Sequence, residues 1–213
     1  MLKALFFDLD GTLLDTEGLI LTCMRHATST VLGYVPPDDL LRDMIGIPLI
    51  KQMRRLDEER AEELVRVYRA HNESVHDDLI KGFPHMECTL VALKNAGYRL
   101  AVVTSKMTLQ AIRGLRFFGL DGHFEFVQGS DATERHKPEP DPLLFAAKTM
   151  ELAPEQCAYI GDSPYDMQSA RAANMLAVAA LWGMFPRERL IQAGAQKEAA
   201  HIEDLITLFE PEV

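Results

Sequence analysis

The chain has 213 residues, of which 47% are hydrophobic and 25% are charged, as expected for a globular protein with one substantial core and a smaller second lobe. Its formal net charge is −10, which argues against a nucleic-acid partner because a phosphate backbone requires a basic surface. The sequence contains neither an apolar run of roughly 18 residues nor a basic, apolar leader, so we expect a cytoplasmic protein without a membrane partner.

The N-terminal segment predicts a buried strand that ends in an acidic turn. Residues 2–7 form a short apolar run rich in aromatic residues, and the sequence Asp-Leu-Asp-Gly-Thr follows directly at residues 8–12. From about residue 17 to residue 79 the pattern changes, because apolar residues recur at helical spacing and no strand-like run appears. We therefore expect several helices in this second stretch.

The rest of the chain alternates between apolar runs and amphipathic segments. It predicts strands at residues 99–103, 124–128, 158–160 and 176–181, and helices at about 85–97, 109–119, 141–152 and from 164 onward. Such alternation is typical of a parallel sheet of about five strands with helices on both faces. The predicted fold class is α/β, with a Rossmann-like core at residues 1–15 and 81–213 and an inserted helical domain at residues 16–80.

Polar residues that follow the apolar runs are the candidates for chemistry, because ligands of open parallel sheets gather beyond the carboxyl ends of the strands. Four groups occupy such places: Asp8 with Asp10, Thr104-Ser105-Lys106, His136-Lys137-Pro138, and Asp162 with Asp166. Asp8 and Asp10 lie two residues apart in an extended segment, so both side chains point to one side, and Gly11 allows a sharp turn behind them. One carboxylate can attack while the other transfers protons; the alternative is a turn with a helix cap.

The other three groups carry weaker signals one by one. The Thr104 hydroxyl and the backbone N–H groups after it can bind a phosphoryl oxygen, although threonine at a strand end is more often a helix cap. Lys137 begins a run of prolines and acids that would fix the direction of its ammonium, whereas a solvated loop lysine is the commoner case. Asp162 and Asp166 suit a hard cation such as Mg²⁺, or else serve as a cap and a dipole-stabilising acid.

Taken in this order, the four groups resemble the motifs of the haloacid dehalogenase superfamily over the whole chain. The inserted helices resemble the α-helical cap of the phosphoglycolate phosphatase-like branch, and residues 46–49 and 104–106 resemble phosphoglycolate phosphatases and the related pyrophosphatases. The resemblance implies a Mg²⁺-dependent phosphatase that cleaves a small anionic phosphorylated substrate through an aspartyl-phosphate. The substrate would be a phosphomonoester similar to 2-phosphoglycolate, or pyrophosphate.

Carried over by position, the resemblance implies a role for each motif residue. Asp8 would be the nucleophile and a Mg²⁺ ligand, Asp10 the general acid and base and a ligand through its backbone carbonyl, and Asp162 the third ligand. Asp166 would act behind these ligands. The phosphoryl group would be held by Leu9, Gly11, Thr104, Ser105 and Lys137. The sequence departs from the family where Pro84-His85 and Ala173-Asn174 stand in place of the usual Pro-Gly and Ala-Gly.

Three alternatives share parts of this pattern. A dehalogenase lacks the second acid of the first motif, so Asp10 argues against it. A β-phosphoglucomutase uses the same acids but lacks the lysine found here as Lys106, which ranks it below a hydrolase. A phospho-accepting receiver domain carries its acceptor in mid-chain and has no inserted helices. The inserted helices are expected to select the substrate, with Ile47, Leu49, Arg54 and His71 as candidates that packing or solvation explains equally well; the pattern leaves the oligomeric state open.

Overall fold

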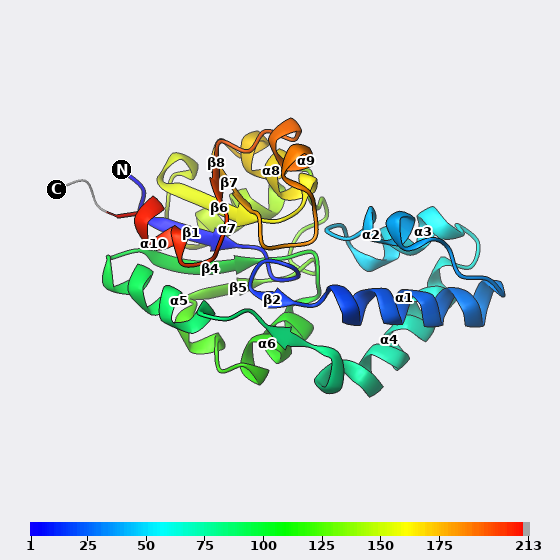
Figure 1. The fold of residues 1–213 in the computed structure, drawn as a ribbon. Helices are drawn as coiled ribbons and strands as arrows, with labels where there is room; N and C mark the ends of the chain where they lie inside the picture. Colours follow the sequence, from blue (N-terminus) through cyan, green and yellow to red (C-terminus); the bar gives the residue numbers. More distant parts are fainter. Residues whose placement is uncertain (211–213) are drawn as a thin grey trace.

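The computed structural model describes residues 1–210, in which an α/β core lies beside a bundle of helices (Figure 1). Six strands of these residues form a parallel sheet in the order β5-β4-β1-β6-β7-β8, so the first strand is central. The strands are β1 (Ala4–Phe7), β4 (Arg99–Val103), β5 (Phe126–Gln128), β6 (Cys157–Gly161), β7 (Leu176–Ala180) and β8 (Lys197–Ala199). The predicted α/β fold class is confirmed.

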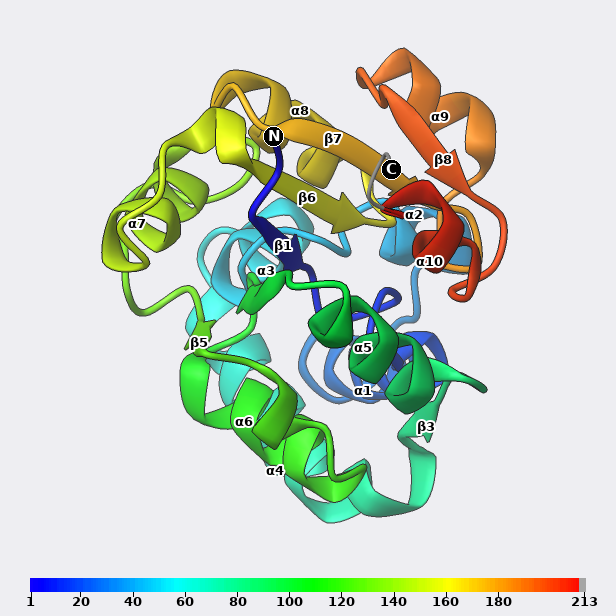
Figure 2. The same ribbon diagram turned by 90° about the vertical axis from the view of Figure 1, so that its left-hand side faces the viewer.

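Side chains of the central strands alternate between two hydrophobic clusters, one on each face of the sheet. Leu5 and Phe7 pack against α5 (Met86–Asn95), α6 (Thr108–Phe117) and α10 (Asp204–Leu208). Ala4 and Phe6 pack against α7 (Asp141–Thr149), α8 (Pro164–Ala172) and α9 (Arg187–Gln192). Figure 2 shows these two groups of helices on opposite sides of the sheet. Burial on both faces explains why the strands read as continuous apolar runs and not as alternating patterns.

The helical bundle consists of the elements between the first strand and residue 80. They are α1 (Glu17–Leu32), α2 (Asp38–Arg42), α3 (Leu49–Leu56) and α4 (Ala61–Leu79). The chain leaves the core through β2 (Leu14–Asp15) and returns through β3 (Lys81–Gly82), and these two short strands pair antiparallel. Two adjacent connections therefore join the bundle to the core. The bundle lies beyond the carboxyl ends of the strands (Figure 1).

The structure differs from the sequence prediction mainly after residue 181. The sheet has one strand more than the predicted five, because Lys197-Glu198-Ala199 pairs with β7 at the edge. Two of its three side chains are exposed and charged, so the strand leaves no apolar run in the sequence. No helix within the described part of the chain combines the length and apolarity needed to span a bilayer.

Two residues take a left-handed backbone at positions where the motifs that this sequence resembles usually have glycine. His85 has a φ of 62° immediately before α5, and Asn174 has a φ of 61° after α8. Asparagine and histidine both occur in this region more often than most other residues do, and asparagine there is common at a helix C-terminus. The backbone path at both positions is thus one that glycine would adopt freely.

Candidate active site

A cavity of about 340 Å³ lies between the carboxyl ends of the strands and the helical bundle. Residues of the core that line it include Asp8, Asp10, Thr104, Ser105, Lys106 and His136. Residues of the bundle that line it include Ile20, Ile45, Ile47, Leu49, Gln52, Tyr68 and Arg69. The structure therefore brings the first two predicted groups and part of the third into one cavity, while Lys137, Asp162 and Asp166 are buried.

Lys137 is the centre of a buried network of polar side chains. Its Nζ lies 3.0 Å from Asp8 Oδ1 and 2.5 Å from Asp166 Oδ1, and it donates a hydrogen bond to the Tyr159 hydroxyl at 3.0 Å. Tyr159 in turn donates to the carbonyl of Val103 at 2.7 Å. Burial alone would lower the pKa of Lys137, but the two carboxylates outweigh it and hold the pKa above its ordinary value, so the side chain stays charged. A solvated loop lysine is excluded, since only 2% of Lys137 is exposed.

Asp166 uses both carboxylate oxygens inside the protein. Oδ1 accepts from Lys137, and Oδ2 accepts from the backbone N–H of Ser163 at 2.9 Å and from its hydroxyl at 2.6 Å. Ser163 is the N-cap of α8, so the capping function foreseen for this segment is real but belongs to Ser163 and not to Asp162. Asp166 therefore fixes the position of Lys137 from behind.

Asp162 is held by hydrogen bonds from both sides. Oδ1 accepts from the Thr12 hydroxyl at 2.9 Å, and Oδ2 accepts from the backbone N–H of Met184 at 2.8 Å. Thr12 is itself anchored, because the Trp182 indole donates to its carbonyl at 2.9 Å. A Cβ at Gly11 would collide with the Asp162 carboxylate, and Gly11 has a φ of 80°, so this position requires glycine.

Three carboxylates at this edge form a buried cluster that can hold a metal ion. Asp8, Asp162 and Asp166 each place one oxygen within 4.8 Å of the others. Asp8 Oδ1 is buried and accepts no hydrogen bond from residues 1–210, despite its ion pair with Lys137. Burial raises the pKa of Asp8 to about 7 against the opposing effect of Lys137, and burial with the charges of Asp166 and Asp8 raises the pKa of Asp162. Since Lys137 pairs with only two of the three acids, and carboxylate oxygens suit a hard divalent cation, the donor set fits such an ion.

The side chain of Asp10 lies outside this cluster and faces the cavity. Its Oδ1 accepts a hydrogen bond from Lys106 Nζ at 2.6 Å, and the two side chains are 16% and 18% exposed. The backbone N–H of Lys106 donates to the Thr104 hydroxyl oxygen at 3.2 Å, which leaves the hydroxyl proton free to donate elsewhere. Asp10 and Thr104 are therefore placed to meet a ligand in the cavity.

Three residues predicted to hold a phosphoryl group have other partners. Ser105 donates its hydroxyl to the carbonyl of Gly46 at 2.7 Å and so joins the core to the bundle. Gly11 donates its N–H to Leu14 at 2.8 Å. The Leu9 side chain is fully buried, but its backbone N–H reaches the Asp8 carboxylate and stabilises the ionised form. Their proposed roles in phosphate binding stay predictions.

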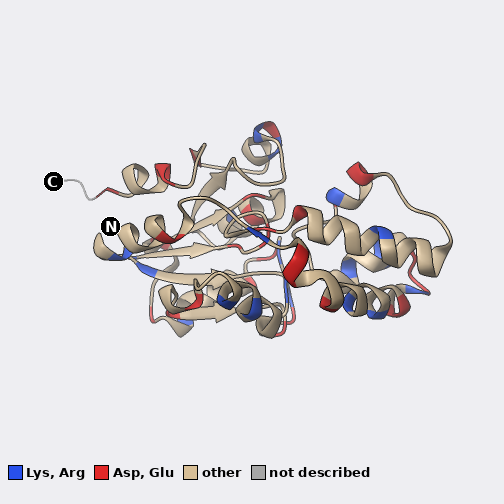
Figure 3. Ribbon diagram, turned by 60° about the horizontal axis from the view of Figure 1, so that its bottom comes forward, with Lys and Arg blue, Asp and Glu red and all other residues tan. Residues whose placement is uncertain are grey.

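Sequence reasoning missed several residues that shape this site. Tyr159 occupies an inward position of a buried strand, which reads as core, and Gln52 lies on a short amphipathic helix. Among the specificity candidates, Ile47 and Leu49 line the cavity. Arg54 instead pairs with Glu58 at 3.6 Å, and His71 stacks on His26 with ring centroids 3.9 Å apart. Figure 3 shows that basic and acidic residues are interspersed along the bundle helices.

Comparison with known proteins places this geometry in context. The family model described as haloacid dehalogenase-like hydrolase matches residues 5–180. The chain is 37% identical to a protein named putative pyrophosphatase PpaX from Caldanaerobacter subterraneus subsp. tengcongensis, over 98% of this chain and 94% of that protein. It is 36% identical to pyrophosphatase PpaX from Halalkalibacterium halodurans, over 82% and 81% of the two chains.

Solved structures give the same picture of the fold. A putative haloacid dehalogenase-like hydrolase from Bacteroides fragilis superimposes with a TM-score of 0.89 at 27% identity, covering 96% of this chain and 100% of the other. A predicted phosphoglycolate phosphatase from Haemophilus somnus superimposes with a TM-score of 0.88 at 25% identity, covering 97% of each chain. Both similarities include the helical bundle as well as the core, because they extend over nearly the whole chain.

Proposed function

The chain belongs to the haloacid dehalogenase-like hydrolase family, and we propose that it is a Mg²⁺-dependent phosphohydrolase that works through an aspartyl-phosphate on Asp8. The family predicted from the motifs is confirmed, and the relatives named pyrophosphatase confirm the predicted enzyme class, a phosphatase. One observation carries the finer proposal. Lys137 Nζ lies 3.0 Å from Oδ1 of Asp8, a buried carboxylate that lines the cavity. The positive charge of the lysine offsets the negative charge of this carboxylate.

In the first step, an oxygen of Asp8 attacks phosphorus and the bond to the leaving oxygen breaks. Lys137 opposes the effect of burial on the pKa of Asp8, which favours the ionised form that attacks, and it lowers the repulsion that an incoming phosphate would meet. The Thr104 hydroxyl donates to an oxygen of the phosphoryl group. These groups are held by hydrogen bonds within the protein before substrate arrives, so little reorganisation is required during transfer.

Asp10 handles the protons of both steps. As a carboxylic acid it gives a proton to the leaving oxygen, and as a carboxylate it takes one from the water that cleaves the aspartyl-phosphate. Its side chain lines the cavity on the core side and lies outside the buried cluster. Lys106 holds it there through the 2.6 Å hydrogen bond.

The carboxylates of Asp8 and Asp162, with the backbone carbonyl of Asp10, are the proposed ligands of Mg²⁺. When bound, the ion supplies positive charge to the transferring phosphoryl group. Asp166 contributes to the buried cluster, but its Oδ1 forms an ion pair with Lys137 at 2.5 Å, whereas Asp162 pairs with no cation of the described chain, so we assign Asp166 the positioning of Lys137.

We assign residues 16–80 to a cap that covers the cavity and residues 1–15 and 81–213 to the catalytic core. The paired strands β2 and β3 are the natural boundary, since both connections cross there. The cap supplies the apolar wall that excludes water from the first step and contacts the leaving group.

The proposal is tested by measuring phosphate release with and without Mg²⁺ from 2-phosphoglycolate, pyrophosphate, hexose phosphates and p-nitrophenyl phosphate. We expect Mg²⁺-dependent release that falls by at least about 10⁴-fold in Asp8→Asn, because the nucleophile is lost. Asp78→Asn, an exposed aspartate on α4, serves as the matched control. Wild-type rates in Asp8→Asn would refute the role of Asp8. Conversion of β-glucose 1-phosphate to glucose 6-phosphate without phosphate release would favour a mutase.

A further inference from the structure

Gln52, on α3 of the bundle, carries a buried acceptor that no residue of the described chain satisfies. The residue is 7% exposed and lines the cavity. Its Nε2 donates to the carbonyl of Ile47 at 2.6 Å, which fixes the orientation of the amide, because the flipped form would set two oxygens against each other. Within residues 1–210, Gln52 Oε1 has no hydrogen-bond donor.

The surroundings of Gln52 imply that the donor comes from the contents of the cavity. Ile20, Ile45 and Ile47 line the same cavity without polar side-chain groups, and the polar bundle residues that also line it, Tyr68, Arg69 and Asn72, donate no hydrogen bond to Gln52 Oε1 within residues 1–210. Buried acceptors in native proteins nearly always have a partner, so one that lines a cavity points to a bound molecule or an ordered water. The reacting groups described above belong to the core, whereas Gln52 belongs to the bundle, where the leaving group would lie.

Pyrophosphate does not match this wall. Its second phosphoryl group is anionic and presents mainly acceptor oxygens, which neither donate to Gln52 nor gain from contact with isoleucine side chains. Of the cations that line the cavity, Lys106 already pairs with Asp10, and Arg69 is solvent-exposed. The carboxylate of 2-phosphoglycolate has the same shortcoming as an acceptor without a proton to donate.

We propose that Gln52 selects the substrate by accepting a hydrogen bond from a hydroxyl group of the leaving group. The preferred substrate class is then a phosphomonoester of a small hydroxylated organic compound and not pyrophosphate. This inference rests on the proposed phosphohydrolase function, and it adds the chemical class of the substrate and a specificity residue in the bundle. The hydroxyl is bound before and after transfer, so it takes no part in bond breaking.

The test compares glycerol 1-phosphate with propyl phosphate, which has the same carbon chain but no hydroxyl groups. We expect wild-type kcat/KM to favour glycerol 1-phosphate by about tenfold or more, because propyl phosphate leaves the acceptor unpaired. Gln52→Met keeps the approximate length of the side chain but removes the acceptor, so the ratio should fall toward one. Because the readout is a ratio, a general loss of activity cancels. Gln110→Met is the matched control, since Gln110 lines the cavity but is exposed, and its ratio should stay that of the wild type.

A second measurement separates this inference from the chemistry. Calorimetric titration of the Asp8→Asn protein and of the Asp8→Asn, Gln52→Met protein with the same two esters gives dissociation constants without turnover. Tighter binding of glycerol 1-phosphate that depends on Gln52 supports the inference even where the mechanism through Asp8 fails. Equal binding of both esters, or faster wild-type turnover of pyrophosphate than of glycerol 1-phosphate, overturns it while leaving a phosphatase intact.

Discussion

The two walls of the cavity are built on different principles. On the core side, the polar atoms around Lys137 are tied to one another, so that Asp166 and Asp162 each accept hydrogen bonds on both oxygens. On the bundle side, the wall is mostly apolar, and the Gln52 acceptor has no partner in the part of the chain that the structure describes. The core wall therefore holds a fixed geometry for a reaction common to many substrates, and the bundle wall is where one substrate can be distinguished from another.

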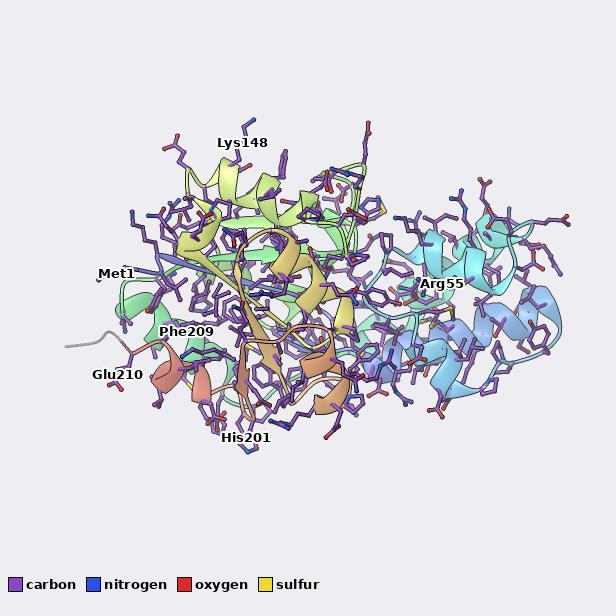
Figure 4. The ribbon with its side chains drawn as sticks, turned by 90° about the horizontal axis from the view of Figure 1, so that it is seen from above. Met1, Arg55, Lys148, His201, Phe209 and Glu210 are labelled. Atoms are coloured by element: carbon purple, nitrogen blue, oxygen red, sulfur yellow. The ribbon has the colours of Figure 1, made fainter. Side chains whose placement is uncertain are left out.

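The largest effect that tests this comparison is expected from Lys137→Met. The change leaves Asp8 and Asp166 buried without their cation, so we expect the free energy of unfolding to fall by about 3 kcal/mol and phosphate release to fall by roughly 10² to 10⁴-fold. Urea unfolding and a phosphate-release assay measure the two quantities. Lys148→Met is the control, because Lys148 projects outward from α7 (Figure 4) and should change stability by less than about 0.5 kcal/mol. Equal free energies of unfolding for the two variants would show that the network of polar side chains around Lys137 does not stabilise the core.

A second prediction concerns the response of the metal-free protein to pH. Burial raises the pKa of Asp8 from 3.8 to about 7, so the folded protein binds this proton more tightly than the unfolded chain does. The stabilisation is complete below about pH 4 and is lost as the pH rises through 7, which amounts to about 4 kcal/mol for the full shift. The raised pKa of Asp162 acts in the same direction.

Unfolding of the wild type and of Asp8→Asn in a chelator between pH 5 and pH 8 measures this contribution. The wild type should lose stability relative to Asp8→Asn as the pH rises, and added Mg²⁺ should reduce the loss, because the ion compensates the ionised carboxylates. If the free energies of unfolding of the two proteins changed equally with pH, the pKa of Asp8 would not be raised in the folded protein.

The same contrast explains how much of the site the sequence could predict. Asp8, Thr104 and Asp162 follow apolar runs directly, and because parallel strands end at one edge, their order along the chain is enough to bring them together. Tyr159 was missed because an inward aromatic on a strand reads as core, and its contact with Lys137 depends on a loop far away in the chain. Local sequence therefore predicts which residues reach the edge of the sheet but not which partners they meet there.

Prediction of side-chain contacts was weakest in the bundle, because the same helical spacing of apolar residues is compatible with many arrangements of packed helices. Ile47 and Leu49 line the cavity as expected of specificity candidates, but Arg54 and His71 pair within the bundle instead. The sequence around Gln52 contains no motif that marks this residue. Its importance arises from the carbonyl of Ile47, which fixes the orientation of its amide, and from the cavity that its side chain lines. Such properties belong to the closed arrangement of bundle and core and not to any periodic pattern.

The smallest expected effect concerns the contacts that hold this closed arrangement. The Tyr165 hydroxyl on α8 donates to the carbonyl of Asp43 at 3.1 Å and accepts from Arg55 Nη1 at 2.9 Å, while Arg189 on α9 forms an ion pair with the Asp43 carboxylate. Arg55 belongs to the bundle (Figure 4), so these exposed contacts bridge the two parts of the chain.

Tyr165→Phe removes both hydrogen bonds but keeps the ring over which the Arg55 guanidinium lies. Exposed polar contacts contribute about 0.5 to 1 kcal/mol each at most, so closure should weaken by a few-fold. We expect KM to rise about two- to fivefold with little change in kcat, since the reacting groups of the core are untouched. Tyr34→Phe, at an exposed tyrosine of the bundle, should leave both constants unchanged. A loss of kcat greater than tenfold in Tyr165→Phe would instead mean that the bundle helps to position the reacting groups. The core wall and the bundle wall would then not have separate functions in catalysis and substrate selection.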